Sequence, residues 1–186
     1  MLKQFLKNPV KTGALCASSP LLSKTMTEDI SIEKAKSVVE LGPGTGAVTR
    51  HIIKSISNET VFFAVELNEE FLHILKEKFP DVKFYNDTAA NLNLMASAEG
   101  LSNIDVIVSG LPWASFSPQL QEELLSAITK SLSPGGIFTT FAYLQGMLLP
   151  SAWNFKKLLN KHFSVVAKSH VVWRNIPPAF VYRCRK

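Results

Sequence analysis

Short runs of β-branched and aromatic residues alternate along the chain with segments whose apolar residues recur every three or four positions. Runs of the first kind predict strands, at residues 38–41, 61–66, 82–85, 105–109 and 137–143. Segments of the second kind predict helices, at residues 20–27, 47–55, 68–79, 117–132 and 151–162. Two further strands, 165–173 and 179–184, form a predicted closing hairpin. This alternation is typical of an α/β fold with a mostly parallel sheet.

The predicted helix ends carry residues suited to these positions. Ser19-Pro20 and Ser117-Pro118 each pair an N-cap hydroxyl with a proline at the first helical position, and Asn68 is a further N-cap candidate. The sequence Pro134-Gly135-Gly136 is expected to stop the helix before it. We find no repeat and no linker in the 186 residues, which predicts one domain spanning residues 1–186.

The charges are unevenly distributed. All 15 acidic residues lie between Glu28 and Glu123. Residues 1–27 carry four basic residues and residues 124–186 carry nine, and neither segment has an acidic one. This asymmetry favours an anionic partner, a membrane or a nucleic acid, although the basic residues could also be spread over several solvated faces.

The first 27 residues are a candidate membrane-contact segment. Its apolar residues fall on one side of a helical projection with lysines beside them, as in a short interfacial helix; these are Leu2, Phe5, Leu6 and Val10 with Lys3, Lys7 and Lys11. A helix packed on the domain is the alternative. Lysines interrupt the apolar residues at the N-terminus, which argues against a signal peptide. No apolar run reaches the length of a membrane-spanning helix. The two cysteines do not suggest a disulfide scaffold. We therefore expect a cytoplasmic protein that associates peripherally with membranes.

A glycine loop follows the first predicted strand. Residues 40–46 read Glu40-Leu41-Gly42-Pro43-Gly44-Thr45-Gly46 and lead from an apolar strand into a helix. Alternating glycines let the backbone turn sharply and bring N–H groups against a ligand. The spacing resembles motif I of the class I S-adenosylmethionine-dependent methyltransferases. Another nucleotide-binding Rossmann domain, or a glycine-rich turn without a ligand, is the alternative.

That resemblance implies a Rossmann-like, seven-stranded sheet with helices on both faces, and S-adenosyl-L-methionine as cofactor. Glu66 ends the second strand, where an acidic group accepts the ribose hydroxyls in Rossmann domains, with Leu67 beside it. By similarity to the family, Asp87 and the backbone near Thr88 would hold the adenine, although a turn aspartate is the alternative. Glu40 would orient the glycine loop or approach the methionine amino group. No cysteine and histidine spacing indicates a metal site.

The candidate acceptor site is the turn Ser109-Gly110-Leu111-Pro112-Trp113, after the fourth strand. It resembles motif IV of amine-methylating enzymes. In adenine-N6 methyltransferases the position of Gly110 carries an asparagine or aspartate that accepts from the target nitrogen, so glycine there puts base methylation in doubt. Trp113 would wall the pocket or make a cation–π contact, or it is a core residue. Tyr143 and Ser109 are candidates for handling the proton, although neither is a compelling general base.

The combination resembles the bacterial phospholipid N-methyltransferases of the phosphatidylethanolamine type. Besides the two motifs, the likeness covers the N-terminal segment 5–22 and Asn175-Ile176-Pro177-Pro178-Ala179. It implies methylation of the amine head group of phosphatidylethanolamine and its partly methylated forms at an anionic membrane surface. The apolar residues 144–150 would line an acyl-chain entrance or plug the core.

Two other functions stay open. An rRNA or nucleic-acid adenine N6-methyltransferase is favoured by the basic ends, although the related dimethyladenosine enzymes carry a helical domain after the sheet and this sequence ends at its last predicted strand. A binding protein without turnover is the second. The sequence does not predict the number of methyl transfers or the oligomeric state.

Overall fold

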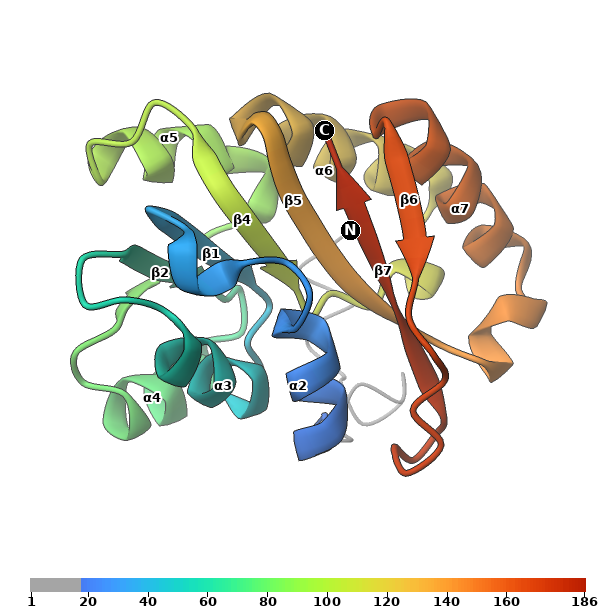
Figure 1. Ribbon diagram of the computed structural model, residues 1–186, viewed down its shortest axis with the longest axis horizontal. Coiled ribbons are helices and arrows are strands. Elements are labelled where there is room, and N and C mark those ends of the chain that lie inside the picture. Colours follow the sequence, from blue (N-terminus) through green and yellow to red (C-terminus); the bar gives the residue numbers. More distant parts are fainter. Residues whose placement is uncertain (1–17) are drawn as a thin grey trace.

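The computed structural model describes residues 18–186 and contains a seven-stranded sheet in the order β3-β2-β1-β4-β5-β7-β6 (Figure 1). The strands pair in parallel except for β7, which is antiparallel to both neighbours. The predicted Rossmann-like architecture is therefore confirmed. The strands are β1 Ser37–Leu41, β2 Val61–Val65, β3 Lys83–Tyr85, β4 Ile104–Ser109, β5 Leu132–Tyr143, β6 Val165–Lys168 and β7 Ala179–Arg185.

Helices cover both faces of the sheet because both faces are apolar. Along β4, Val106 and Val108 pack with α2 and α3, whereas Ile107 faces the opposite core with α5, α6 and α7. A strand buried on both sides reads as a continuous apolar run, which is why the strands were recognisable in the sequence. The helices are α2 Pro20–Thr27, α3 Ala47–Ser55, α4 Glu69–Lys78, α5 Leu92–Ala98, α6 Pro118–Ser131 and α7 Pro150–His162, with 3₁₀ turns at Ile32–Lys34, Ala89–Asn91, Trp113–Ser115 and, as η5, Gln145–Leu148.

The predicted caps form. The Ser19 hydroxyl accepts from the Leu22 N–H, the Ser117 hydroxyl from the Leu120 N–H, and Asn68 caps α4 by accepting from the Glu70 and Phe71 N–H groups. Such caps satisfy backbone donors that the first turn leaves without partners.

Three element predictions need correction. No helix was predicted at α5, which has only seven residues. Strand β5 begins at Leu132, because Leu132 pairs with Ile104 before a register shift that absorbs the Pro-Gly-Gly segment. Strand β6 ends at Lys168 rather than residue 173, and pairing resumes only as an isolated bridge between Val172 and Ala179.

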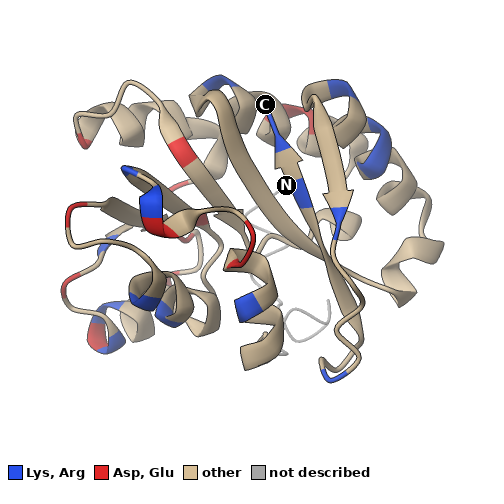
Figure 2. Cartoon of the chain, viewed as in Figure 1, with Lys and Arg blue, Asp and Glu red and all other residues tan. Residues whose placement is uncertain are grey.

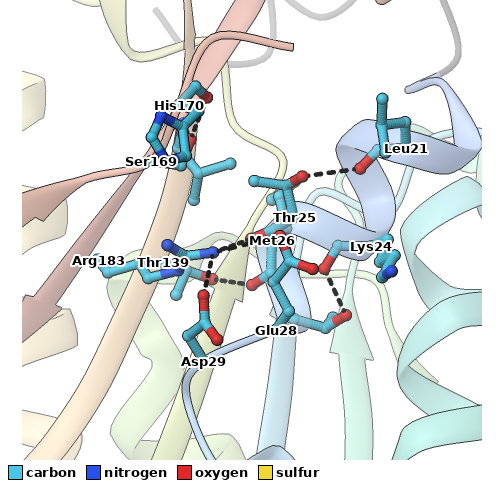
Figure 3. A network of polar contacts seen from close by, with 12 residues as sticks. Leu21, Lys24, Thr25, Met26, Glu28, Asp29, Thr139, Ser169, His170 and Arg183 are labelled. Carbon is cyan, nitrogen blue, oxygen red and sulfur yellow. Dashed lines mark hydrogen bonds and ion pairs between the residues drawn. The ribbon is translucent and has the colours of Figure 1, made fainter.

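Helix α2 is fastened to late parts of the chain (Figure 3). The Thr139 hydroxyl of β5 donates to the Met26 carbonyl at 3.0 Å, and Arg183 of β7 donates to the Thr25 carbonyl at 2.9 Å. Arg183 also pairs with Asp29, at 3.5 Å. The part of the predicted membrane-contact segment before residue 18 lies outside the described residues.

The topology places a ligand site between β1 and β4. From β1 the chain runs outward through β2 to β3, and then returns to the other side of β1 with β4 and β5. In open α/β sheets, ligands bind outside the carboxyl ends of the strands at such a switch point. The glycine loop follows β1 and the acceptor turn follows β4, so both lie there.

Candidate functional site

The glycine loop turns through left-handed backbone at three positions. Gly42, Gly44 and Gly46 have φ angles of +71°, +55° and +82°, which L side chains rarely adopt. The Gly42 N–H donates to the Val65 carbonyl at 2.9 Å and so anchors the loop to β2. A Cβ atom at Gly44 would meet nothing within 4 Å, so this side of the loop is open to a ligand.

Glu66 connects the loop to the end of β2. Its Oε2 accepts from the Gly44 N–H at 3.1 Å and its Oε1 accepts from the Asn68 N–H at 2.9 Å. The side chain is buried, and this burial raises the pKa of its carboxyl although the backbone donors counteract the shift. Glu66 thus holds the loop while lining a cavity.

Leu67, Asp87 and Thr88 line the same cavity as Glu66. This cavity is open to solvent and has a volume of about 730 Å³. The Asp87 Oδ1 accepts from the Thr88 N–H at 2.6 Å and from the Asn91 amide at 2.9 Å. These bonds fix Asp87 just after β3, in the lining of the cavity that Glu66 also lines. The structure therefore brings together the residues predicted to bind the adenosine.

A larger cavity adjoins the first along the carboxyl edge of the sheet. It encloses about 1080 Å³ open to solvent, and Gly42, Gly44 and Leu111 line both spaces. Pro43, Thr45, Trp113 and Tyr143 also line it. None of the described residues that line it is charged, so its wall suits an apolar ligand or a neutral amine.

Glu40 lies apart from both cavities. It has an exposed fraction of 1%, and its Oε2 accepts from the Thr49 hydroxyl of α3 at 2.6 Å. Burial raises the pKa of this carboxyl to about 8. The observed contact ties β1 to α3 just below the glycine loop, and a direct contact between Glu40 and the cofactor stays a prediction.

The acceptor turn packs directly on the glycine loop. The Gly110 N–H donates to the Leu41 carbonyl at 2.8 Å, and a Cβ atom at Gly110 would lie only 2.5 Å from the Gly42 carbonyl oxygen. Ser109 is fully buried, and its hydroxyl accepts from Trp113 Nε1 at 3.1 Å and from the Leu111 N–H at 3.3 Å. These contacts give Ser109 a role in shaping the turn.

Trp113 is a rigid part of the cavity wall. Its ring stacks on Phe155 with centroids 4.6 Å apart and meets Phe116 and Phe138 edge-on. Its exposed fraction is 2%, so the indole is held in one position. The Phe155 ring covers one face of the indole. The predicted cation–π contact would therefore have to use the other face.

Gln121 is a site-shaping residue that the sequence reasoning missed. It is fully buried on α6, and its amide nitrogen donates to the Trp113 carbonyl at 2.8 Å and to the Ser151 carbonyl at 3.0 Å. Its amide oxygen accepts from Asn154 at 2.7 Å. Gln121 thereby joins the acceptor turn to α7. A polar residue in register with the apolar Leu124, Leu125 and Ile128 was the available signal.

The site has room and suitable groups for S-adenosylmethionine. The smaller cavity offers the Glu66 carboxylate for ribose hydroxyls, and the open side of Gly44 lets a ligand approach the backbone. The larger cavity then lies where a methyl group and its acceptor would meet.

Comparisons with known proteins agree with this geometry. A family model described as "Methyltransferase domain" matches residues 39–138. The ornithine lipid N-methyltransferase of Singulisphaera acidiphila is 30% identical over 99% of this chain and 93% of its own length. Ribosomal RNA small subunit methyltransferase A of Sulfurihydrogenibium sp. is 34% identical, but over 39% of this chain and 29% of its own.

Among solved structures, the O-methyltransferase from Bacillus cereus in complex with SAH superposes with a TM-score of 0.73. The match is 15% identical and covers 100% of this chain and 90% of that one. Family model, relative and fold point the same way. The chain belongs to the class I S-adenosylmethionine-dependent methyltransferases.

Proposed function

We propose that the protein methylates the amine of a membrane-lipid head group while peripherally bound to the membrane. Phosphatidylethanolamine and its partly methylated forms are the first candidates, as the sequence resemblance implies. An ornithine lipid is the second, because the end-to-end relative is named for that substrate. The observation that carries the proposal is this likeness, which extends over 93% of the relative's length.

The larger cavity, to which no described residue contributes a charge, supports this substrate class. Phe141, Ala142, Met147 and Ala152 give its wall an apolar surface beside the acceptor turn. An amine carried on a lipid can reach the turn while its apolar neighbours are taken out of water. A nucleic acid would bring a run of backbone phosphates, which need several cationic partners, whereas a phosphatidylethanolamine head group brings a single phosphate.

The packing of Gly110 argues against adenine methylation. An enzyme that resembles the adenine-N6 methyltransferases would need an amide or carboxylate side chain at this position. The first side-chain atom would lie 2.5 Å from the Gly42 carbonyl oxygen, well inside van der Waals contact. The chain therefore has space for a backbone acceptor at this point and none for that side chain.

S-adenosylmethionine, when bound, supplies an electrophilic methyl group on a sulfonium. The protein's task is to hold a neutral amine in line with that methyl. The bound cofactor would give this methyl to the amine lone pair, a C–N bond replacing the C–S bond, and the amine would lose its proton to water or a nearby oxygen. Deprotonating an amine of pKa about 10 costs about 4 kcal/mol at pH 7. Tyr143 and the Gly110 carbonyl are the groups we propose for guiding that proton.

The test is methyl transfer to lipid and to RNA in parallel. The protein is incubated with radiolabelled S-adenosylmethionine and vesicles of phosphatidylglycerol mixed with phosphatidylethanolamine or ornithine lipid, or with unmodified rRNA. We expect label in the organic phase, lost in Glu66→Ala and kept in Glu69→Ala, a matched change at an exposed acid three residues away. Label only in RNA would refute the lipid proposal.

A further inference from the structure

Large apolar side chains protrude from two segments at the carboxyl edge of the sheet. Leu148 ends η5, Leu149 links it to α7, and Trp153 lies in the first turn of α7. Trp173 and Ile176 lie in the connection from β6 to β7. The exposed fractions are 85% for Leu148, 63% for Trp153, 70% for Trp173 and 80% for Ile176. We call these five residues the apolar rim.

The two segments flank the larger cavity. Met147 and Ala152 line the cavity, and each is a chain neighbour of a rim residue. The β6–β7 connection joins the same region, because the Leu144 N–H donates to the Pro178 carbonyl at 2.9 Å. Figure 1 shows both segments near the end of β5, where β7 begins.

A second set of contacts fixes the connection beside the cavity. Asn175, between Trp173 and Ile176, is buried and accepts from the Ser19 N–H at 3.0 Å, while its amide donates to the Pro177 carbonyl at 2.7 Å. Ser18, which directly precedes Ser19, lines the larger cavity. The exposed Trp173 and Ile176 are thus held next to the opening.

The elements that carry the rim have basic residues of their own and no acidic ones. No acidic residue follows Glu123, so η5, α7, β6, β7 and their connections carry none, and Figure 2 shows only blue and tan on η5, β7 and the β6–β7 connection. Arg174 lies within the rim's second segment. Protruding leucine, isoleucine and tryptophan beside an arginine match the interface of an anionic bilayer.

RNA is a poorer match to the same surface. Single-stranded RNA is bound by aromatic platforms within a continuous cationic groove. Here Leu148 and Ile176, the most exposed of the rim, offer no stacking face and would place aliphatic surface against a polar ligand. In a bilayer the same side chains leave water.

We propose that the apolar rim inserts into the interfacial region of an anionic bilayer and holds the cavity open toward the lipid head groups. This inference rests on the proposed function, because it supplies the surface from which a lipid substrate enters. The rim acts separately from cofactor binding, since none of its residues lines either cavity.

The experiment uses the double variant Leu148→Ser/Ile176→Ser in the full chain. Leu94→Ser is the matched control, because Leu94 has an exposed fraction of 64% but lies on α5, away from the cavity lining. We measure sedimentation with phosphatidylcholine vesicles containing phosphatidylglycerol, the Kd for S-adenosylmethionine, and methylation of vesicle-borne and of monomeric short-chain phosphatidylethanolamine.

We expect the double variant to lose at least tenfold in vesicle affinity and in kcat/KM on vesicles. Its Kd for S-adenosylmethionine and its activity on the monomeric lipid should match those of the wild type, and Leu94→Ser should behave as wild type throughout. Vesicle binding unchanged in the double variant would overturn the proposal, as would a loss of RNA binding in place of vesicle binding.

The two proposals fail in different ways. Rim-dependent vesicle binding without methylation of any lipid would remove the proposed function and keep the membrane surface. Lipid methylation with vesicle binding indifferent to Leu148 and Ile176 would do the reverse.

Discussion

Replacing Gly110 with alanine is expected to cripple the enzyme without unfolding it. The added Cβ would lie 2.5 Å from the Gly42 carbonyl oxygen, whereas carbon and oxygen ordinarily approach to about 3.3 Å. The acceptor turn and the glycine loop must therefore separate by about 0.8 Å. Overpacking of this kind costs about 1–3 kcal/mol of folding stability, and a misplacement near 1 Å costs about a hundredfold in rate.

The assay combines a thermal melt, calorimetric titration with S-adenosylmethionine and steady-state methyl transfer. We expect Gly110→Ala to melt cooperatively, to bind the cofactor more weakly and to lose about a hundredfold in kcat/KM. Gly100→Ala is the control, because Gly100 has a positive φ, of +72°, which Gly110 lacks, while its Cβ would meet nothing within 4 Å. It should lose about 1–2 kcal/mol of stability from backbone strain alone and keep its cofactor affinity. Gly110→Ala with kinetics like those of the wild type would refute the reasoning.

Three further changes test other parts of the site. Glu66→Gln removes the charge that accepts from Gly44 and should weaken S-adenosylmethionine binding by about 1.5–3 kcal/mol in a calorimetric titration; an unchanged Kd would contradict this. Burial raises the pKa of Glu40 from 4.5 to about 8, so the folded protein retains a proton that the unfolded chain releases, and stability is lost as the pH rises between these values. We would measure thermal melts of the wild type and of Glu40→Gln at pH 5, 7 and 9. The wild type should lose stability relative to Glu40→Gln as the pH rises to about 8, and no further above that. A stability difference between the two proteins that does not change with pH would be inconsistent with a buried, protonated Glu40. Gln121→Leu leaves the Trp113 carbonyl without its buried donor and should lower the free energy of unfolding by about 1–3 kcal/mol and raise KM for the acceptor, with the cofactor Kd unchanged; a shift in the cofactor Kd instead would count against its role at the acceptor turn.

Much of the fold was predictable because its signals are local. The β-branched run of β1 and the glycines after it specify a strand and a sharp turn within nine residues, 38–46. The caps at Ser19, Asn68 and Ser117 likewise act within three residues of themselves. The candidate cofactor residues follow from this, since they lie at strand ends whose positions the pattern supplies.

What the sequence did not reveal depends on distant contacts. Helix α5 buries Leu92, Met95 and Ala96, which have helical spacing, but the helix has only seven residues. Helical periodicity is recognised over windows of about 11–18 residues, so a helix this short does not stand out in the sequence. The role of Gln121 depends on the carbonyls of Trp113 and Ser151, which lie 8 and 30 residues away. The closeness of Gly110 to Gly42 likewise appears only once β1 and β4 are adjacent.

Helix α2 is synthesised early, but two of its hydrogen-bond partners, on β5 and β7, are synthesised much later. Its Met26 carbonyl accepts from Thr139, 113 residues later, and its Thr25 carbonyl from Arg183, 158 residues later. At a synthesis rate of about 5–20 residues per second, Arg183 is made about 8–30 s after Thr25. During that interval Leu22 and Met26, both fully buried in the finished fold, have no complete surface to cover them. Helix α2 therefore completes its contacts only after β5 and β7 have been made.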